Sequence, residues 1–560
     1  MVKEKAKVML KIVLYQFKPI PDGITENLKK LIKFYHKNSH ADLILTPELS
    51  LCGYSPLDYL FNFEFQETIK QALSTLQQET ASHNTAILIG TPLFQGNTIY
   101  NGAVLIQKGK IIHTIYKNKL PNHSVFNENR YFSIKENTSN IITIKNTKVA
   151  IFICEDMWHT TFVEKVLQNS VDLIISINAS PFEINKNQAR QEIAFNIIKK
   201  YKIPLIYLNL VGGIDNLVFD GSSFVLDNNS KIVTYLNHAQ EDSEELTYNS
   251  KNIECKTPKS YPTNKLQLIY NILILGLQDF IKNTGNKGVI LGISGGIDST
   301  LSTAIAVDAL GSEYVMGISM PSKFTSTLSQ DIISQISHNF KIKIHNIPIN
   351  SYFESYEKGL HKNLSFTANN VAENLQARIR GNILMAFANN FPKYIVLTTG
   401  NKSELATGYS TLYGDTCGAF NLLKDLYKTD VFALAKWRNE NLPTNALKPI
   451  SNPIPAVAIT RKPSAELKPN QFDEDSLMNY NTLDKILYAL IEKEESLEEL
   501  YKVHQQELVN KVVTLLNNSQ YKREQSAIGI KISSRSFSKE YYYNISSNFN
   551  KLNYNNPKKL

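Results

Sequence analysis

Residues 289–310, VILGISGGIDSTLSTAIAVDAL, decide the fold of the second half of this chain. The run VILGI has the length and apolar character of a buried strand, and the loop SGGIDS follows it directly. The next segment predicts a helix whose apolar face is formed by Leu301, Ala304, Ile305 and Ala309. A strand, a glycine loop and a helix in this order predict the first unit of an α/β layered domain.

The loop has the chemistry of a phosphate-binding site. Gly295 and Gly296 allow backbone N–H groups to approach an anion, and the helix N-terminus favours negative charge. The hydroxyls of Ser294 and Ser299 add donors. A carboxylate here would repel phosphate, so Asp298 is expected to bind magnesium or to organise the loop. A glycine-rich turn without a ligand is the structural alternative.

Further apolar runs at residues 315–319, 343–349 and 394–399 alternate with helical segments. This order predicts a parallel sheet with helices on both faces, and ligands of such sheets bind beyond the carboxyl ends of the strands. Residues 476–516 are again helical in pattern, and the Asn- and Tyr-rich tail after residue 535 is expected to fray.

The first half of the chain also alternates strand and helix patterns, from residue 7 to about residue 235. Residues 239–264 are polar, contain two prolines and have no sustained hydrophobic period, as is typical of a linker. We therefore predict a first domain at residues 1–240, a linker or docking segment at residues 241–264 and a second domain at residues 265–560.

Composition excludes several classes of protein. The chain has 560 residues, of which 42% are hydrophobic and 20% charged, so it is expected to be globular and not disordered. No signal peptide or membrane span is expected, and four widely spaced cysteines favour a reducing, cytoplasmic compartment over a disulfide framework. A net charge of +9 spread over this length suits anionic substrates and does not demand nucleic acid.

A reactive thiol is predicted in the first domain. Cys154 follows the apolar run KVAIFI, Glu48 ends ADLILTPE and Lys117 ends GKIIHTIYK, so all three are expected at strand ends on one rim. Amide cleavage uses these residue types as nucleophile, general base and oxyanion-stabilising cation. The alternatives are an inert buried cysteine and a surface salt bridge.

Four segments of the first domain resemble the nitrilase-type glutaminase domain of glutamine-dependent NAD synthetases: TPELSLCGYSPLDYL, YKNKLPNHSVFNENRYF, ICEDMW and NASPFEINKNQAR. The resemblance implies an α-β-β-α sandwich and assigns Glu48 as the base, Lys117 as the oxyanion-stabilising lysine and Cys154 as the nucleophile. It also implies a glutamine-binding set, with Glu128 near the pocket entrance, made of His123, Glu128, Ser180 and Lys186. The family usually has Tyr where this sequence has His123, which puts glutamine affinity in question.

In the second domain, SGGIDS resembles the loop of ATP pyrophosphatases, and AENLQARIRG, TTGNKSELATGYSTLYGDTCGAF, LKDLYKTDVF and KPSAELKPNQFDEDSL resemble the Rossmann-like domain of the same synthetase family. The resemblance implies ATP at Ser294, Gly295, Gly296, Ile297, Asp298, Ser299, Thr399, Lys428 and Ser464. It implies deamido-NAD at Asn374, Arg378, Glu404, Asp415 and Lys522, and magnesium at Asp298 and Glu404. Solvated charges on one helix are the alternative for Arg378 and Arg380. The segment KREQSAIGIKISSRSF carries SAIG where prolines are common in the family, which makes the geometry around Lys522 less certain.

Taken together, these resemblances predict a ligase that frees ammonia from glutamine and uses ATP and Mg²⁺ to convert deamido-NAD to NAD. Ammonia is expected to travel by a route shielded from solvent. Because members of the family form homo-oligomers, the resemblance implies a homo-oligomer, and no nucleic-acid or membrane partner is expected. Three alternatives stay open at this point: an amidotransferase that uses another acyl acceptor, an RNA-modifying pyrophosphatase, and a synthetase whose glutaminase domain is inactive.

Overall fold

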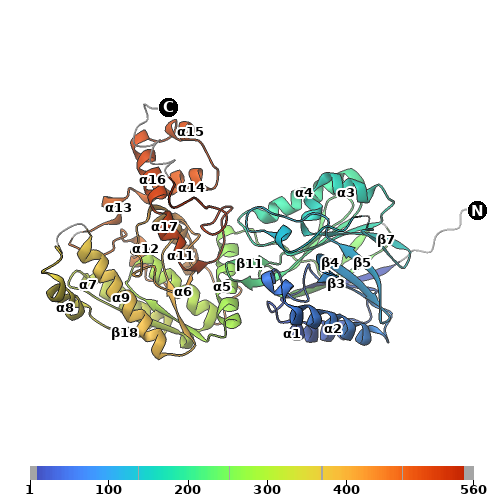
Figure 1. Ribbon diagram of the computed structural model, residues 1–560, viewed down its shortest axis with the longest axis horizontal. Coiled ribbons are helices and arrows are strands. Elements are labelled where there is room, and N and C mark those ends of the chain that lie inside the picture. Colours follow the sequence, from blue (N-terminus) through green and yellow to red (C-terminus); the bar gives the residue numbers. More distant parts are fainter. Residues whose placement is uncertain (1–8, 137, 251, 367–369, 470, 548–560) are drawn as a thin grey trace, which may run out of the picture. The chain divides into compact units, whose positions relative to one another are not determined.

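The computed structural model describes residues 9–136, 138–250, 252–366, 370–469 and 471–547 (Figure 1). The chain divides into two compact units. The first runs to Ile214 and resumes at Val218–Thr263, and the second comprises Asp215–Leu217 and the chain from Asn264 onward. None of the helices within the described ranges is both long enough and apolar enough to cross a membrane.

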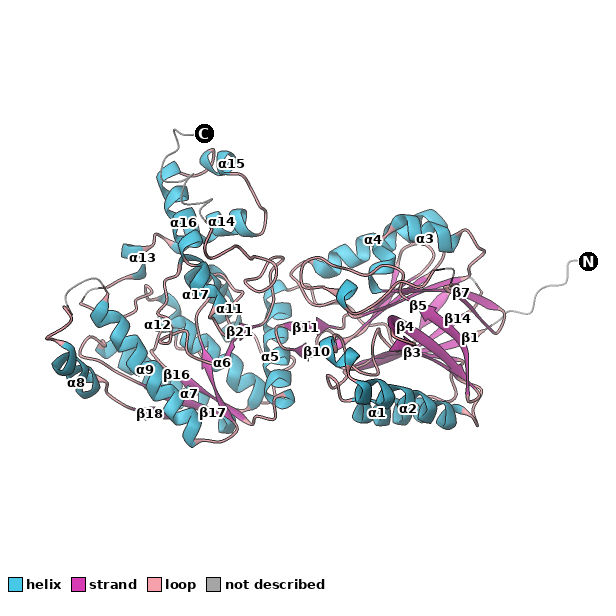
Figure 2. Cartoon of the chain, viewed as in Figure 1, coloured by secondary structure: helices cyan, strands magenta, loops and turns pink. Residues whose placement is uncertain are grey.

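Two sheets lie face to face at the centre of the first unit (Figure 2). The seven-stranded sheet has the order β15 (Ile253–Cys255), β14 (Asp242–Tyr248), β1 (Leu10–Gln16), β2 (Leu43–Leu45), β3 (Ala86–Gln95), β4 (Thr98–Gln107), β5 (Lys110–Tyr116). The six-stranded sheet has the order β13 (Ile232–Tyr235), β12 (Phe224–Leu226), β9 (Leu205–Asn209), β8 (Leu173–Asn178), β7 (Thr147–Ile153), β6 (Ile141–Ile144). Strands β10 (Val211–Ile214) and β11 (Leu217–Asp220) pair separately.

Helices cover the outer face of each sheet. Figure 1 shows α1 (Ile24–Lys37) and α2 (Phe63–Thr80) on one side, and α3 (Thr160–Leu167) and α4 (Lys186–Tyr201) on the other. One apolar cluster joins the inward faces of the two sheets, and a second packs β7, β8 and β9 against α3 and α4. Short 3₁₀ helices occupy Leu57–Phe61, Glu128–Arg130 and Cys154–Trp158. The predicted α-β-β-α sandwich is confirmed.

The segment at residues 241–264, predicted as a linker or docking segment, is strand over much of its length. Within residues 241–264 the structure forms β14 and β15, and β14 pairs antiparallel with β1 from Leu10↔Tyr248 to Gln16↔Asp242. The buried positions of β14 alternate at Glu244, Leu246 and Tyr248. This period of two is a strand pattern that the acidic composition of DSEELTY concealed.

The second unit contains a parallel sheet, as predicted. Its order is β18 (Lys343–Asn346), β17 (Val315–Ser319), β16 (Gly288–Gly292), β19 (Tyr394–Thr398), β20 (Phe420–Asn421), β21 (Ile528–Gly529), and every neighbouring pair is parallel. On one face, Ile290 of β16 and Val396 of β19 pack with α9 (Val371–Asn390). Side chains alternate across a strand, so Val289 and Leu291 point to the opposite face, where α6 (Ile297–Leu310) lies.

The remaining helices of the second unit surround this sheet and extend from it. They are α5 (Lys265–Asn283), α7 (Thr327–Phe340), α8 (Asn350–Leu360), α10 (Lys402–Thr407), α11 (Lys428–Glu440), α12 (Ala456–Thr460), α13 (Asp473–Ser476), α14 (Tyr480–Ile491), α15 (Leu497–Tyr501), α16 (Gln506–Asn518) and α17 (Gln520–Glu524), with a 3₁₀ turn at Ser312–Tyr314. A separate apolar cluster joins α14, α15 and α16 to Phe537 and Tyr541. The tail is therefore packed at these two residues, and residues 548–560 lie outside the described part.

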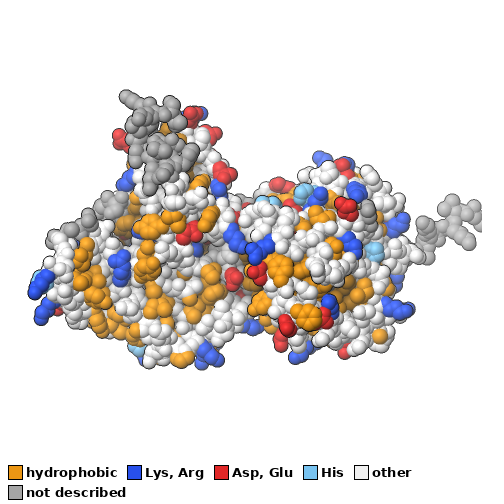
Figure 3. Space-filling view, viewed as in Figure 1, with side chains coloured by type: hydrophobic (Ala, Val, Ile, Leu, Met, Phe, Trp, Pro, Cys, Tyr) orange, Lys and Arg blue, Asp and Glu red, His pale blue; other side chains and the backbone are white. Residues whose placement is uncertain are grey.

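Charged side chains are mixed on the face drawn in Figure 3. Lys and Arg side chains are scattered there among Asp and Glu, and they do not gather into one continuous stripe. Nucleic-acid binding relies on a concentrated basic footprint. This face therefore gives no support to the RNA alternative.

Candidate functional site

Cys154 stands where β7 ends and a 3₁₀ helix begins. Its φ of 48° lies in the left-handed region, which non-glycine residues adopt at an energetic cost, and its side chain is 6% exposed. The carboxylate of Asp156 holds this turn: it accepts from the backbone N–H groups of Ile153 at 3.1 Å and of Asn118 and Lys119 at 2.8 Å. The same carboxylate thus ties the thiol-bearing turn to the segment that follows Lys117.

Lys117 lies between two carboxylates with no exposed side-chain surface of its own. Its Nζ donates to Glu48 Oε1 and to Glu128 Oε1, each at 2.7 Å. Burial alone would lower the pKa of the Lys117 ammonium, but the two carboxylates outweigh it and raise that pKa above its ordinary value. The two carboxylates therefore favour the charged form of Lys117.

Glu48 is held at both oxygens. Oε1 also accepts from Asn101 Nδ2 at 2.7 Å, and Oε2 accepts from the Ala179 backbone N–H at 2.9 Å. Burial, together with the nearby Glu48 carboxylate, raises the pKa of the Cys154 thiol well above its ordinary value, although Lys117 opposes the shift. Burial therefore favours the neutral thiol form of Cys154, and the buried Glu48 carboxylate lies near enough to interact with it electrostatically.

Glu128 occupies a different place from the one expected. The sequence prediction put it near a pocket entrance, whereas the structure buries it at 3% exposure against Lys117. The turn that carries it folds inward because its backbone N–H donates to Pro121 O at 3.0 Å. Glu128 Oε1 also accepts from Tyr54 OH at 2.8 Å, and Oε2 has no hydrogen-bond partner in the described structure. Burial raises the pKa of the Glu128 carboxyl to about 7 despite the neighbouring lysine.

Two other predicted glutamine contacts, His123 and Lys186, lie near the 3₁₀ helix that begins at Cys154. His123 is 66% exposed at its side chain, with Nε2 3.6 Å from Glu155 Oε1. Lys186, the first residue of α4, places Nζ 4.9 Å from the centre of the Trp158 ring. Their roles as glutamine contacts stay predictions. Tyr54 and Asn101 contact the buried carboxylates, and the sequence has no catalytic spacing that marks either of them as a site residue.

Ser180 belongs to a buried network around Arg190. Its Oγ accepts from Arg190 Nε at 3.2 Å, and its backbone oxygen accepts from Arg190 NH2 at 2.8 Å. Arg190 also pairs with Asp220 at 2.9 Å and has no exposed side-chain surface. Because Ser180 follows Ala179, whose N–H donates to Glu48, Arg190 holds the loop that contacts Glu48.

We expect Arg190→Met to destabilise the first unit by about 3–5 kcal/mol, because the substitution leaves Asp220 buried without its partner. Trp158 and Trp437 are the two tryptophans, so in a Trp437→Phe background the fluorescence of Trp158 reports urea unfolding of the first unit. Lys199→Met, on the exposed side of the same helix, is the matched control.

Adding Asp220→Asn to Arg190→Met removes the orphan charge and is expected to restore part of the lost stability. An unchanged urea midpoint in Arg190→Met would contradict a structural role for the pair.

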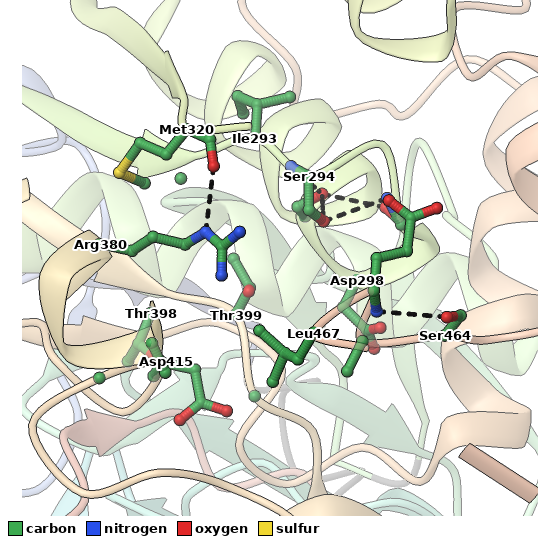
Figure 4. Close-up of a pocket in the computed structure, with 18 of the residues that line it drawn as sticks. Ile293, Ser294, Asp298, Met320, Arg380, Thr398, Thr399, Asp415, Ser464 and Leu467 are labelled. Carbon is green, nitrogen blue, oxygen red and sulfur yellow. Dashed lines mark hydrogen bonds between the residues drawn. The ribbon is translucent and has the colours of Figure 1, made fainter. Parts of the chain in front are cut away.

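A cavity of about 290 Å³ opens in the second unit beside the ends of β16, β17 and β19 (Figure 4). It is lined by most residues of the predicted ATP set and by two of the predicted deamido-NAD set: Ser294, Gly296, Ile297, Asp298, Ser299, Thr399, Lys428, Ser464, Glu404 and Asp415. The position at the carboxyl ends of parallel strands is the one that the strand order predicted. Segments 130 residues apart in sequence, around Asp298 and Lys428, thus meet at one site.

The predicted phosphate loop is preorganised. Gly295 has a φ of +78°, and a Cβ there would lie 2.9 Å from Ser329 O, so only glycine fits without a shift. Gly296 N–H donates to Ser294 Oγ at 3.2 Å, and Ser299 Oγ donates to Gly296 O at 3.0 Å. These bonds fix the turn immediately before α6 begins.

Lys428 bridges the two predicted magnesium ligands. Its Nζ donates to Asp298 Oδ2 at 2.5 Å and to Glu404 Oε1 at 3.1 Å. Burial alone would lower the pKa of Lys428, but Asp298 and Glu404 outweigh it and raise the pKa above the ordinary value. Burial raises the pKa of Glu404 to about 8, against the effect of Lys428.

Asn401 fixes the acidic pair. Its Nδ2 donates to Asp298 Oδ1 at 2.9 Å, and its Oδ1 caps α10 by accepting from Glu404 N–H at 3.0 Å. Carboxylate oxygens of both residues therefore meet at one lysine, in a cavity sized for a ligand.

The remaining deamido-NAD set does not line this cavity. Asn374 Oδ1 accepts from Thr411 Oγ1 at 2.9 Å, and Lys522 Nζ donates to Gly408 O and Ser410 O at 2.7 and 2.6 Å. Arg378 is exposed, and its Nε donates to Leu412 O at 3.2 Å. Their contact with a dinucleotide stays a prediction.

Comparisons with known proteins agree with this two-site arrangement. A carbon-nitrogen hydrolase family model matches residues 12–250, and an NAD synthase model matches residues 269–526. The glutamine-dependent NAD(+) synthetase of Synechocystis sp. is 38% identical over 553 residues, covering 94% of this chain and 97% of that protein. The corresponding protein of Acinetobacter baylyi is 39% identical over 544 residues, covering 96% and 98%.

A solved structure leads to the same family. The glutamine-dependent NAD+ synthetase from Acinetobacter baumannii, determined in complex with adenosine diphosphate, is 35% identical, has a TM-score of 0.76 and covers 96% of this chain and 98% of its own. Both halves of the chain, in the same order, are matched over nearly their full length. The chain belongs to the family of glutamine-dependent NAD(+) synthetases.

Proposed function

We propose that this chain hydrolyses glutamine at Cys154 and uses the ammonia, with ATP, to convert deamido-NAD to NAD. The observation that carries this proposal is the pairing of Lys117 with Glu48 beside a buried cysteine in one unit, together with a cavity lined by SGGIDS and Lys428 in the other. The first arrangement suits amide hydrolysis and the second suits nucleotidyl transfer. A ligase that forms a carbon–nitrogen bond needs both.

In the first half-reaction, Glu48 accepts the Cys154 proton as sulfur attacks the glutamine amide carbon. Lys117 stabilises the negative oxygen of the tetrahedral intermediate. Collapse expels ammonia and leaves a glutamyl thioester, and water activated by Glu48 then releases glutamate. The proton required by the leaving nitrogen is the one that Glu48 received from the thiol.

In the second half-reaction, the nicotinate carboxylate of deamido-NAD attacks the α-phosphorus of ATP and pyrophosphate departs. Lys428 provides positive charge in the cavity for the departing phosphates. Ammonia then attacks the acyl carbon of the adenylate and AMP leaves, which gives the amide of NAD. The carboxylate needs this activation because an oxide anion is a poor leaving group.

Magnesium fits the donor set in this cavity. Asp298 and Glu404 are hard oxygen donors within reach of the same Lys428 Nζ. No group of three His, Cys, Asp or Glu suited to a metal occurs among the described residues, and Mg²⁺ is commonly held by one or two carboxylates plus substrate phosphates. The two residues would hold a Mg²⁺–nucleotide complex, in which the metal neutralises phosphate charge.

The inactive-glutaminase alternative loses support from the geometry. Glu48, Lys117 and Cys154 lie together and buried, and His123 is on the exposed side of the site. The replacement of the family's usual Tyr therefore leaves the three reacting groups intact. Assembly into a homo-oligomer remains part of the proposal as an expectation from the family.

The test is NAD formation from deamido-NAD, ATP and Mg²⁺ with either glutamine or ammonium as nitrogen donor. We expect both donors to support wild-type turnover, with one AMP and one pyrophosphate formed per NAD. Release of ADP and phosphate would contradict the adenylylation step. AMP formation only with a different carboxylic acid would favour the alternative amidotransferase.

A further inference from the structure

The cavity of the second unit is lined by more acidic than basic residues, and the proposed function gives a role to Asp298, Glu404 and Lys428 but none to Arg380. Among the described residues that line it, five are acidic: Asp298, Glu404, Asp415, Glu466 and Asp473. Three lining residues are basic: Arg380, Lys428 and Arg461. A nucleoside triphosphate is itself strongly anionic, so its binding depends on the basic side chains of the cavity that are not already paired with carboxylates.

Two of the three cations are already engaged by carboxylates. Lys428 contacts both Asp298 and Glu404. Arg461 donates to Ser329 Oγ at 2.8 Å and to Glu466 at 3.4 Å. Their charges are therefore shared with protein groups before any ligand arrives.

Arg380 differs from both. Its Nε donates to the backbone oxygen of Met320 at 3.1 Å, but within the described residues it makes no salt bridge and its two terminal nitrogens have no hydrogen-bond partner. A guanidinium group carries five donors in a planar fork, so the face suited to bidentate binding is left open. Burial lowers the pKa of Arg380 to about 10, with Glu466 opposing, so the group remains charged at neutral pH.

The helix aims this side chain at the cavity. Ala377, Arg380, Gly381 and Leu384 all line it, and this spacing of three, four and seven residues is one stripe of α9. Alanine and glycine leave room on either side of the arginine. Figure 4 shows the guanidinium group directed from α9 into the cavity, on the side of Thr399 and Ser294. Arg378 stands two residues earlier, off this stripe, and is exposed.

We infer that Arg380 binds a phosphoryl group of ATP and supplies the uncompensated positive charge of the site. The inference rests on the proposed function, because that function places ATP in this cavity. Phosphate is the ligand that an open guanidinium fork recognises best, through two parallel charge-assisted hydrogen bonds. The dinucleotide substrate carries phosphate as well, so the experiment must separate the two sources.

The experiment compares wild type, Arg380→Gln and Arg380→Lys by calorimetric titration of the full chain with ATP, adenosine and deamido-NAD, each alone. We expect Arg380→Gln to weaken ATP binding about 10- to 100-fold and to leave adenosine binding unchanged. Arg380→Lys keeps the charge and loses the fork, so it should restore part of the affinity. Lys448→Gln removes an exposed lysine elsewhere in the unit and serves as the charge-matched control.

Three results would overturn the inference. Equal ATP affinity in wild type and Arg380→Gln would show that no phosphate contact exists. Weakened deamido-NAD binding with unchanged ATP binding would assign the arginine to the dinucleotide. Equal losses for ATP and adenosine would indicate a structural role. If Arg380→Gln does not fold, Arg380→Lys tests the phosphate contact in its place, and its adenosine binding shows that it is folded. If only the inference about Arg380 is wrong, the wild-type enzyme still binds ATP and makes NAD. A wild-type enzyme that does not bind ATP would overturn the proposed function as well.

Discussion

Cys154→Ala is expected to lose NAD formation from glutamine by on the order of 10⁴-fold or more, and to keep NAD formation from ammonium near the wild-type rate. The substitution removes the atom that attacks the amide, and no other described side chain at Lys117 and Glu48 offers a nucleophilic sulfur. The loss is expected in the kcat of the glutamine-dependent reaction. The KM for ammonium should not change, because the second cavity belongs to the other unit. Parallel assays of NAD and glutamate formation with the two donors measure it.

Cys255→Ala is the matched control. Cys255 is a free thiol of the same unit, on the edge strand β15, and takes no part in the Cys154 network. We expect it to retain both activities. If Cys154→Ala lost ammonium-dependent synthesis to the same degree as the glutamine reaction, the division of labour between the two sites would be wrong.

The second large effect is expected at Lys428. Lys428→Met should lower NAD formation from either donor by about 10²- to 10³-fold, because it removes preorganised positive charge from the phosphates in the transition state. It also leaves Asp298 and Glu404 facing the ligand without their shared cation. Steady-state rates with saturating ammonium isolate this step from glutamine hydrolysis.

Two further variants interpret that loss. Lys436→Met, on the exposed side of the same helix, is expected to keep wild-type rates. Lys428→Arg retains the charge and should recover part of the activity. A Lys428→Met enzyme that keeps its melting temperature and its wild-type rate would remove Lys428 from the reaction.

Much of the fold was predictable because its signals are local. The strands that carry Cys154 and the SGGIDS loop are short apolar runs that end in turn residues, and the structure places them as predicted. Strand β14 was not recognised, because four of the first five residues of its sequence, DSEELTY, are acidic or polar. Its burial depends on pairing with β1, more than 200 residues away in the chain, and composition carries no record of that pairing.

The candidate sites divide in the same way. Strand-end position and residue type predicted Cys154, Glu48, Lys117 and the phosphate loop as site residues. Glu128 was expected at a pocket entrance and is buried against Lys117. The sequence could not show which of Arg378 and Arg380 faces the cavity, because the two residues are of the same type. Residues two apart on a helix point about 200° away from each other, so only one of the pair can face the cavity, and packing of α9 on the sheet selected Arg380.

The sequence by itself therefore determined the α/β class of both domains, the two chemically distinct motifs and the residue types available for each reaction. These depend on hydrophobic period, on glycine conformation and on side-chain chemistry, all of which are written in neighbouring residues. Only the tertiary structure decided which charges are paired and which remain open. Pairing requires that residues far apart in the chain, such as Asp298 and Lys428 or Glu48 and Lys117, be brought within hydrogen-bonding distance, and that distance is set by the packing of whole elements.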